Sequence, residues 1–208
     1  MRRRPHLHRR HHQASARRRS VDALHVSGPT LETPRLLLRL PRAEDFDAWA
    51  AFMADEESAR FIGGHQPRAV AWRGFTSVAG AWQIQGFAMF SVIEKATGRW
   101  VGRLGPWQPE GWPGTEVGWS IVREAWGLGY AVEGSAAAID WAFANLGWDE
   151  VIHTIAPENH ASQRVAIKLG SRKLERSARL PPPFEQAAVE IWGQTRAEWF
   201  AQRAKVPL

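Results

Sequence analysis

One stretch in the second half of the chain restricts the fold more than any other. Residues 115–122 have the pattern of a strand, and residues 130–146 repeat apolar side chains at intervals of three and four, as a helix does. Gly127 and Gly129 lie in the short loop between them. A strand that passes through such a loop into a helix predicts a fold in which strands and helices alternate, at least in this half of the chain.

The same loop has the features of an anion site. The first N–H groups of a helix have no partner within the helix, and the helix dipole favours negative charge beside them. Gly127 and Gly129 let the main chain approach an anion closely, because no Cβ intervenes. The pattern is neither G-x-G-x-x-G, since Val132 takes the third place, nor a P-loop. Two glycines alone also fit a tight turn that binds nothing.

Periodicity and turn residues predict the other elements. The predicted order is a strand, two helices, a meander of three strands, a helix, a strand, a helix and further strands, which is an α+β (mixed α/β) class with helices on both faces of a mixed sheet. We expect strands at residues 31–40, 87–94, 99–107, 151–156, 171–178 and 187–194, and helices from residue 42, at 68–83, from Asn159 or Ser162 to 169, and at 195–204.

Length and composition exclude several classes of protein. The 208 residues, 44% of them hydrophobic, suffice for one substantial core, so we expect one domain over residues 31–204 after an extension and linker at 1–30. No run approaches the roughly 20 apolar residues of a membrane span. The chain has no cysteine, which excludes disulfides, thiolate metal sites and a cysteine nucleophile, and which fits a cytoplasmic protein. We expect no metal.

The excess positive charge is confined to the first 20 residues. They hold eight arginines and no acid, so the net charge of +6 becomes 19 basic against 21 acidic residues, or −2, for residues 21–208. The run has no hydrophobic periodicity, and we expect it to be disordered. It fits an electrostatic arm for nucleic acid, a targeting peptide or a dispensable extension. We favour the extension, because the rest of the chain has no basic excess for docking on nucleic acid.

Four segments resemble, in order, the GNAT superfamily of N-acetyltransferases, and within it the branch of ribosomal-protein Ser/Ala N-acetyltransferases. They are residues 31–39, 116–119, 126–133, and 159–162 followed by 168–170. The likeness runs from about residue 31 to 199. It implies a central mixed, mostly antiparallel twisted sheet with helices on both faces, in which two parallel strands splay apart. Members of the family are often homodimers, so a homodimer is an expectation too.

The resemblance also implies a coenzyme site for acetyl-CoA between the splayed strands, residues 116–122 and 151–156. The backbone of Val117, Trp119 and Ile121 would pair with the pantetheine arm. Asn159 would contact pantetheine, and Ser162 would lie near the sulfur. The pyrophosphate would be held by the loop residues Trp126, Gly127, Leu128, Gly129, Tyr130 and Ala131, mainly through their backbone amides.

Acetylation of an amine needs a base for the ammonium, a donor to the thioester oxygen and a proton for the departing thiolate. Glu116 is the leading candidate for the base, and its alternative is an ordinary strand acid. His153 on the neighbouring strand is the second candidate, and its alternative is a core histidine with satisfied hydrogen bonds. Many family members place a tyrosine where this chain has Ala166, so we expect Ser162 to donate to the thiolate.

The sequence therefore predicts transfer of an acetyl group from acetyl-CoA to a primary amine, of a small molecule or a protein N-terminus, by direct attack on the thioester. Two tryptophans, Trp107 and Trp112, flank a turn before the proposed catalytic strand and could line an apolar or cationic acceptor site or simply pack the turn. The alternatives for the whole protein are a non-catalytic acyl-CoA sensor and a nucleic-acid-binding protein that uses the arginine-rich arm.

Overall fold

The structure is a computed structural model that describes residues 28–206. The expectations for the arginine-rich segment, its disorder and its possible contact with nucleic acid, lie outside the described residues. The strands are β1 (Leu31–Glu32), β2 (Leu36–Arg39), β3 (Phe90–Glu94), β4 (Trp100–Trp107), β5 (Glu116–Ile121), β6 (Glu150–Ile155), β7 (Arg172–Lys173) and β8 (Glu190–Thr195). The helices are α1 (Phe46–Ala54), α2 (Glu56–Ala59), α3 (Arg68–Ile84), α4 (Tyr130–Asn145), α5 (His160–Lys168) and α6 (Arg196–Gln202), with short 3-10 turns at Ala43–Asp45, Arg123–Ala125 and Arg203–Lys205.

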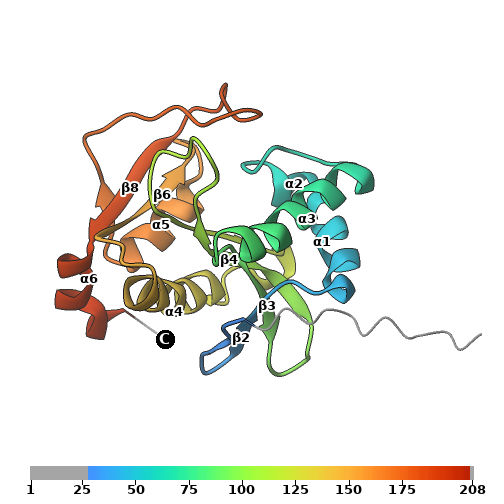
Figure 1. The fold of residues 1–208 in the computed structure, drawn as a ribbon, viewed down its shortest axis with the longest axis horizontal. Coiled ribbons are helices and arrows are strands. Elements are labelled where there is room, and N and C mark those ends of the chain that lie inside the picture. The colour runs from blue at the N-terminus through green and yellow to red at the C-terminus, as the bar shows by residue number, and fades with distance from the viewer. Residues whose placement is uncertain (1–27, 207–208) are drawn as a thin grey trace, which may run out of the picture.

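The strands form one sheet in the order β1-β2-β3-β4-β5-β6-β8-β7. Every neighbouring pair is antiparallel except β5 and β6, which are parallel. A parallel pair needs a crossover connection, and α4 supplies it between β5 and β6. The predicted fold class, a mixed and mostly antiparallel sheet with helices, is confirmed (Figure 1).

Two adjacent residues of β4 show that helices cover both faces of the sheet. Neighbouring side chains of a strand point to opposite faces. The guanidinium of Arg103 lies 4.5 Å from the centre of the Trp49 ring in α1. Leu104 packs under α4, where a Cβ added at Gly134 would lie 2.6 Å from its side chain. Therefore α1 and α4 cover opposite faces, with α3 beside α1 and α5 beside α4 (Figure 1).

Two expected strands differ from the structure, and one helix was not expected. Residues 31–40 are not one strand: Thr33 turns the chain back, its hydroxyl accepting the Leu36 N–H at 2.9 Å, and β1 pairs antiparallel with β2. The short helix α2 was not expected; Asp55 caps it by accepting the Ser58 N–H at 3.0 Å. The strand at 171–178 shortens to the two residues of β7.

A buried ion pair fixes the start of α1 against the sheet. Asp45, just before α1, accepts hydrogen bonds from both terminal nitrogens of Arg39 in β2, each at 2.8 Å. Its carboxylate also accepts the Ser91 hydroxyl of β3 at 2.7 Å and the Arg42 N–H at 2.8 Å. Because every donor is nearby and the acid is buried, Asp45 joins two strands to the helix that begins beside them.

Asp45→Ala is expected to lower the free energy of unfolding by about 3 kcal/mol or more, because it leaves the Arg39 guanidinium buried without its carboxylate. Urea unfolding followed by tryptophan fluorescence measures the loss. Asp47→Ala is the matched control, since Asp47 pairs with Arg68 at the surface, where ion pairs contribute little. Equal losses in the two variants would contradict the role of Asp45.

Candidate active site

The parallel strands β5 and β6 separate almost as soon as they meet. Each has six residues, but they pair only where Glu116 lies opposite Ile152. A backbone bond from the Ile152 N–H to the Thr115 carbonyl, 3.0 Å long, belongs to this pairing. Beyond it β6 continues along β8, so the described residues leave one side of β5 without a neighbouring strand.

The backbone groups that face this gap follow from the pairing of β5 with β4. Val122 donates its N–H to the Val101 carbonyl at 2.9 Å, and antiparallel ladders alternate between bonded and non-bonded pairs. Ser120 and Gly118 are therefore bonded to β4. The N–H and C=O groups of the alternate residues face the gap, and these are the three residues that the sequence assigned to pantetheine: Val117, Trp119 and Ile121.

Two side chains bond to the backbone groups that would otherwise have closed the gap with a hydrogen bond between the strands. In a continuous parallel ladder the Thr154 N–H would donate to the Val117 carbonyl. Instead the Thr154 N–H donates to Glu116 Oε1 at 3.1 Å, and the Val117 carbonyl lies 2.7 Å from His153 Nδ1. The two catalytic candidates thus stand where the strands part, and they keep the Thr154 N–H and the Val117 carbonyl from being left unpaired.

Glu116 is a buried acid held by three donors. Besides the Thr154 N–H, its carboxylate accepts the Thr154 hydroxyl at 3.0 Å and the indole N–H of Trp112. Burial raises the pKa of Glu116 to about 7, because the charged form loses more solvation than these donors return. The side chain is therefore poised to gain or lose a proton near neutral pH, which suits a general base.

His153 is buried and neutral. Burial lowers its pKa to about 4, against the opposing effect of the Val117 carbonyl. A carbonyl can only accept, so Nδ1 carries the proton, and Nε2 accepts the Ser171 hydroxyl at 2.9 Å. The Ser171 oxygen in turn accepts Gln194 Nε2 at 2.9 Å. Both ring nitrogens have hydrogen-bond partners, so His153 has a structural role in forming the gap.

The glycine loop follows the free side of β5. Gly127 and Gly129 have φ angles of 76° and 85°, in the left-handed region that favours glycine, and Gly129 is the N-cap of α4. A Cβ at Gly127 would meet nothing within 4 Å, so the space before the helix is open. Trp126 donates its indole N–H to the Ile121 carbonyl at 2.7 Å. The loop therefore presents backbone amides beside the end of the gap.

Residues from the start of the domain brace this loop. Arg35 Nη1 donates to the Leu128 carbonyl at 2.7 Å, and its Nη2 lies 2.6 Å from the Glu133 carboxylate in α4. Glu133 also accepts the Thr33 hydroxyl at 2.6 Å. Burial opposes its ionisation, but the bonds from Thr33 and Arg35 outweigh burial and hold the pKa of Glu133 below its usual value. Arg35 also stacks on Tyr130, 4.8 Å from the ring centre.

The helix α5 borders the gap from the other side. Asn159 caps it through Oδ1, which accepts the Ser162 N–H at 3.1 Å, and leaves its amide NH₂ free to donate. The Ser162 oxygen accepts the indole N–H of Trp119 at 3.2 Å, so its own hydrogen stays available. Ala166, at the family's tyrosine position, is fully buried. Ser162 is thus the side chain of α5 that lies close to β5 with a proton to give.

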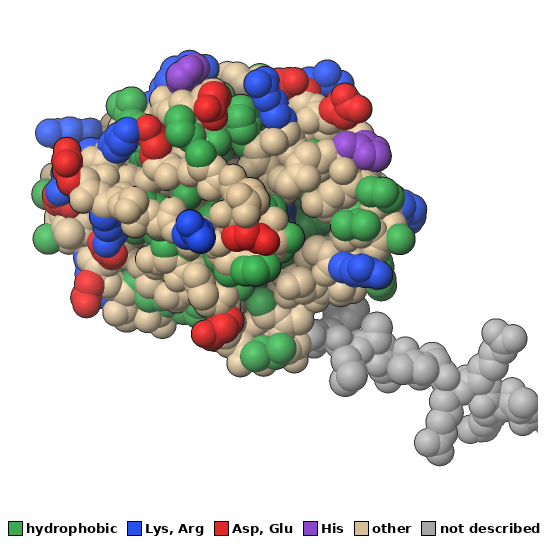
Figure 2. Space-filling model, turned by 90° about the horizontal axis from the view of Figure 1, so that it is seen from above, with side chains coloured by type: hydrophobic (Ala, Val, Ile, Leu, Met, Phe, Trp, Pro, Cys, Tyr) green, Lys and Arg blue, Asp and Glu red, His purple; other side chains and the backbone are tan. Residues whose placement is uncertain are grey.

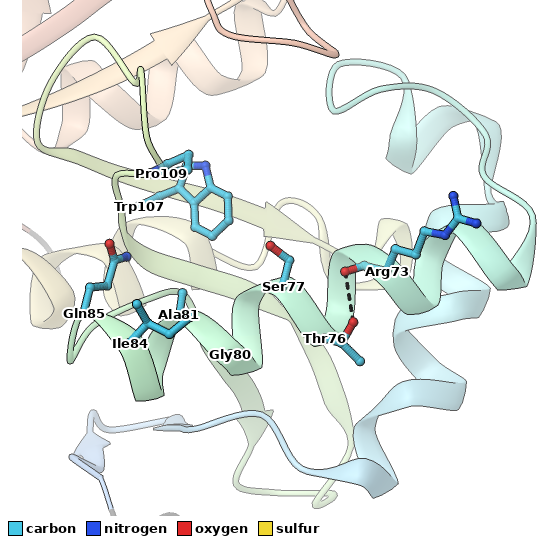
Figure 3. Close-up of a pocket in the computed structure, with 9 residues that line it drawn as sticks. All are labelled: Arg73, Thr76, Ser77, Gly80, Ala81, Ile84, Gln85, Trp107 and Pro109. Atoms are coloured by element: carbon cyan, nitrogen blue, oxygen red, sulfur yellow. Dashed lines mark hydrogen bonds between the residues drawn. The ribbon is translucent and has the colours of Figure 1, made fainter.

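A groove opens on the sheet face that carries Glu116. Trp107 of β4 is paired with Glu116, so both side chains point to that face, and the Trp107 ring lies 6.4 Å from the Trp112 ring. The groove runs between Trp107 and α3 and has a volume of about 510 Å³ (Figure 3). Its lining residues are Arg73, Thr76, Ser77, Gly80, Ala81, Ile84, Gln85, Trp107 and Pro109.

The structure adds residues that the sequence did not reveal. Thr154 gives Glu116 two of its hydrogen bonds, and Arg35 braces a loop 93 residues away. No local pattern marks either one. The stripe Ser77, Gly80 and Ala81 on α3 was detectable, because small residues at helical spacing leave room for a ligand or a partner. Within residues 28–206 no group of three or more His, Asp or Glu is placed to hold a metal ion.

None of the helices between residues 28 and 206 has the length and apolar character needed to cross a membrane.

Comparison with known proteins agrees with this geometry. A model of the acetyltransferase (GNAT) domain matches residues 35–172. YkkB, an uncharacterized protein of Bacillus subtilis, is 36% identical over 87 residues, which are 41% of this chain and 51% of YkkB, about half its length. The crystal structure of an acetyltransferase from Agrobacterium tumefaciens is 29% identical, covers 82% of this chain and 96% of that one, and has a TM-score of 0.72.

The branch suggested by the sequence is also found among the structural neighbours. The ribosomal-protein-S5-alanine acetyltransferase from Vibrio fischeri has a TM-score of 0.63 and covers 82% of this chain and 98% of that chain. Its identity of 17% shows likeness of fold alone. The resemblance to the family is confirmed. A ribosomal-protein acetyltransferase is among the proteins whose fold is similar to that of this chain.

The raised pKa of Glu116 predicts a pH-dependent cost to stability. The folded protein keeps this proton up to about pH 7, while the unfolded chain loses it near 4.5, so rising pH destabilises the fold across that window. Relative to Glu116→Gln, the free energy of unfolding of the wild type is expected to fall by on the order of 3 kcal/mol over this range. Urea unfolding of both proteins at several pH values measures it, and parallel pH curves would contradict the burial of a titrating acid.

Proposed function

The chain belongs to the GNAT acetyltransferase family, and from this premise we propose that it transfers the acetyl group of acetyl-CoA to a primary amine. The observation that carries the proposal is the continuous path from the open side of β5 to the glycine loop at the start of α4. GNAT domains use acetyl-CoA. Its extended pantetheine arm matches the open side of β5, and the pyrophosphate that follows the arm matches the glycine loop. A chain without cysteine has no need of an oxidising compartment, and we place the enzyme in the cytoplasm.

In this proposal the pantetheine arm lies along β5 as an added strand. Its amides exchange hydrogen bonds with the N–H and C=O of Trp119 and with the N–H of Ile121, and the arm passes Val117, whose carbonyl His153 already holds. The free amide NH₂ of Asn159 donates to it from α5. The pyrophosphate lies against the amides of residues 127–131, where unpaired N–H groups and the dipole of α4 both favour negative charge.

The reaction then needs no covalent intermediate on the protein. Glu116 removes the proton from the acceptor ammonium, and the neutral amine attacks the thioester carbon. The new C–N bond forms as the C–S bond breaks, and a backbone N–H of β5 stabilises the oxygen on which charge develops. The thiolate of coenzyme A leaves while the Ser162 hydroxyl donates a hydrogen bond to it, and the thiolate takes up the second proton, which the nitrogen loses as the amide forms. His153 acts as a positioning residue, because it holds the Val117 carbonyl and keeps the gap open.

The groove beside Trp107 is the proposed acceptor site. It lies on the same sheet face as Glu116, while the α5 side of the gap holds Ser162, so the two substrates would meet from opposite faces at the point where the strands part. Trp112 donates to Glu116 and lies beside Trp107, so its ring links the aromatic side of the groove to the base.

One observation favours a different function. Ala166 stands where many relatives have a tyrosine, and a protein that binds acyl-CoA without transferring the acyl group would not need that proton donor. A nucleic-acid-binding role finds no support on the surface of the domain in Figure 2, where basic and acidic side chains are intermixed. Turnover of acetyl-CoA with an amine distinguishes transferase from sensor, and the raised pKa of Glu116 favours the transferase.

Gly127→Glu is expected to weaken acetyl-CoA binding at least tenfold, because it places negative charge where the pyrophosphate would lie. Calorimetry measures the dissociation constant. Gly147→Glu is a closely matched control: Gly147 has a φ of 64° against 76° for Gly127, neither has atoms within 4 Å of an added Cβ, and Gly147 follows the far end of α4. The control is expected to bind like the wild type. Equal binding by both variants would exclude this loop as the phosphate site.

The pH dependence of turnover is expected to report Glu116. With acetyl-CoA saturating, kcat/KM for the amine should decline below about pH 7, because the base is then protonated. Glu116→Gln should lower kcat by about 100-fold or more and alter this decline. The rate at which the thiol of coenzyme A is released measures both the pH dependence and the loss of kcat. A variant with the rate and pH profile of the wild type would assign the base to another group.

A further inference from the structure

We propose that the groove along α3 selects acceptors that carry one amine on an apolar body and an anionic group at the far end. This inference rests on the proposed transferase activity and narrows it to a class of acceptor. The amine would lie at the Glu116 end, the apolar body against Trp107, and the anion beside Arg73.

The composition of the groove excludes a polycation. Of the nine lining residues only Arg73 is charged, and no acid is among them. Trp107, Ala81 and Ile84 provide apolar surface, and the exposed fraction of Ile84 is 88%, so this surface is open to a ligand. A second ammonium group on the acceptor would find no carboxylate in the groove and would be repelled by Arg73. An apolar body gains free energy when it lies against this surface, because apolar area is then removed from water.

The shape of the groove comes from small residues on one stripe of the helix. Arg73, Ser77, Gly80 and Ile84 recur at spacings of three and four, so they share one side of α3. Between the ends of this stripe the side chains are small or absent, which leaves space across from the ring of Trp107. Figure 3 shows Trp107 across from Ser77, with Arg73 toward one end of the helix and Gln85 at the other.

Arg73 is free to bind an anion. Among the described residues no carboxylate lies within 4.0 Å of its guanidinium, whereas Arg68 on the same helix pairs with Asp47 and stacks 4.5 Å from the ring of Phe46. A guanidinium without a protein partner at the edge of an apolar groove can form paired hydrogen bonds with a carboxylate or a phosphonate. The charge of the groove and the charge of the proposed ligand are therefore complementary.

The order of the three subsites follows from the sheet. Trp107 and Glu116 are directly paired on β4 and β5, so the amine that reaches Glu116 lies next to the Trp107 ring. Ser77 faces that ring, and Arg73 lies one turn of α3 further on, about 6 Å along the helix axis. An acceptor must therefore span from the base across the indole to the guanidinium, which an elongated monoamine with a terminal anion does.

A matched pair of probes tests the charge requirement. The compounds are para-(aminomethyl)benzoate and para-(aminomethyl)benzamide, which have the same amine and ring and differ in the anion. Tryptophan fluorescence measures their binding to the protein saturated with coenzyme A, and acetylation is measured separately. The proposal predicts that the acid binds about tenfold more tightly than the amide. Spermidine is the polycationic probe and is expected to bind more weakly than either.

Two pairs of variants locate the effect. Arg73→Gln should abolish the preference for the acid without weakening the amide, and Arg68→Gln should retain the preference. Gly80→Leu should fill the groove and weaken both probes, while Gly74→Leu should not. An added Cβ at either glycine meets nothing within 4 Å, and leucine favours helix more than glycine does, so both proteins are expected to fold.

Equal binding of acid and amide by the wild type, or a preference that survives Arg73→Gln, would overturn the proposal. Tighter binding of spermidine would overturn it as well. Failure of the proposed transferase function has a separate signature, because the protein would then bind the acid in preference to the amide and acetylate neither. Because binding of the probes is measured without turnover, the test of the groove does not depend on the rate of acetyl transfer.

Discussion

The exchange of one backbone hydrogen bond between β5 and β6 for two side-chain bonds organises the rest of the structure. Parallel strands that kept their ladder would bond Thr154 to Val117 and close the sheet. Here Glu116 takes the N–H of one and His153 takes the carbonyl of the other. The strands can part without leaving the Thr154 N–H or the Val117 carbonyl unpaired, and the edge of β5 beyond them becomes available inside the domain, where free strand edges are rare.

Because of this exchange, the two side chains that replace the backbone bond lie on opposite faces of the sheet. Glu116 points toward the groove of α3, and His153 packs 4.8 Å from the ring of Trp119 on the α5 side. A carboxyl group buried against its preference for water weakens the fold, and active sites commonly retain such groups because the reaction needs them. Hydrogen bonds from distant elements, Gln194 to Ser171 and Arg35 to Leu128, keep the two ends of the site in place.

Local pattern predicted much of this fold from the sequence. Helical spacing located α3 and α4 to within a residue or two, and Gly127 and Gly129 marked the loop where the chain changes direction. The strand at residues 31–40 was wrong because a hydroxyl of Thr33 forms a turn that apolar alternation does not reveal. Contacts such as Thr154 with Glu116 join separate elements, so only the assembled sheet shows them.

Hydrogen exchange at β5, followed by NMR with and without acetyl-CoA, tests the open strand edge most directly. The amides of Trp119 and Ile121 face the gap, and those of Gly118 and Ser120 are bonded to β4. The account predicts that the first pair exchanges fast in the free protein and slows at least tenfold when acetyl-CoA binds, while the second pair is protected in both states. Protection of Trp119 before the coenzyme is added, or no change in its exchange at saturation, would contradict it.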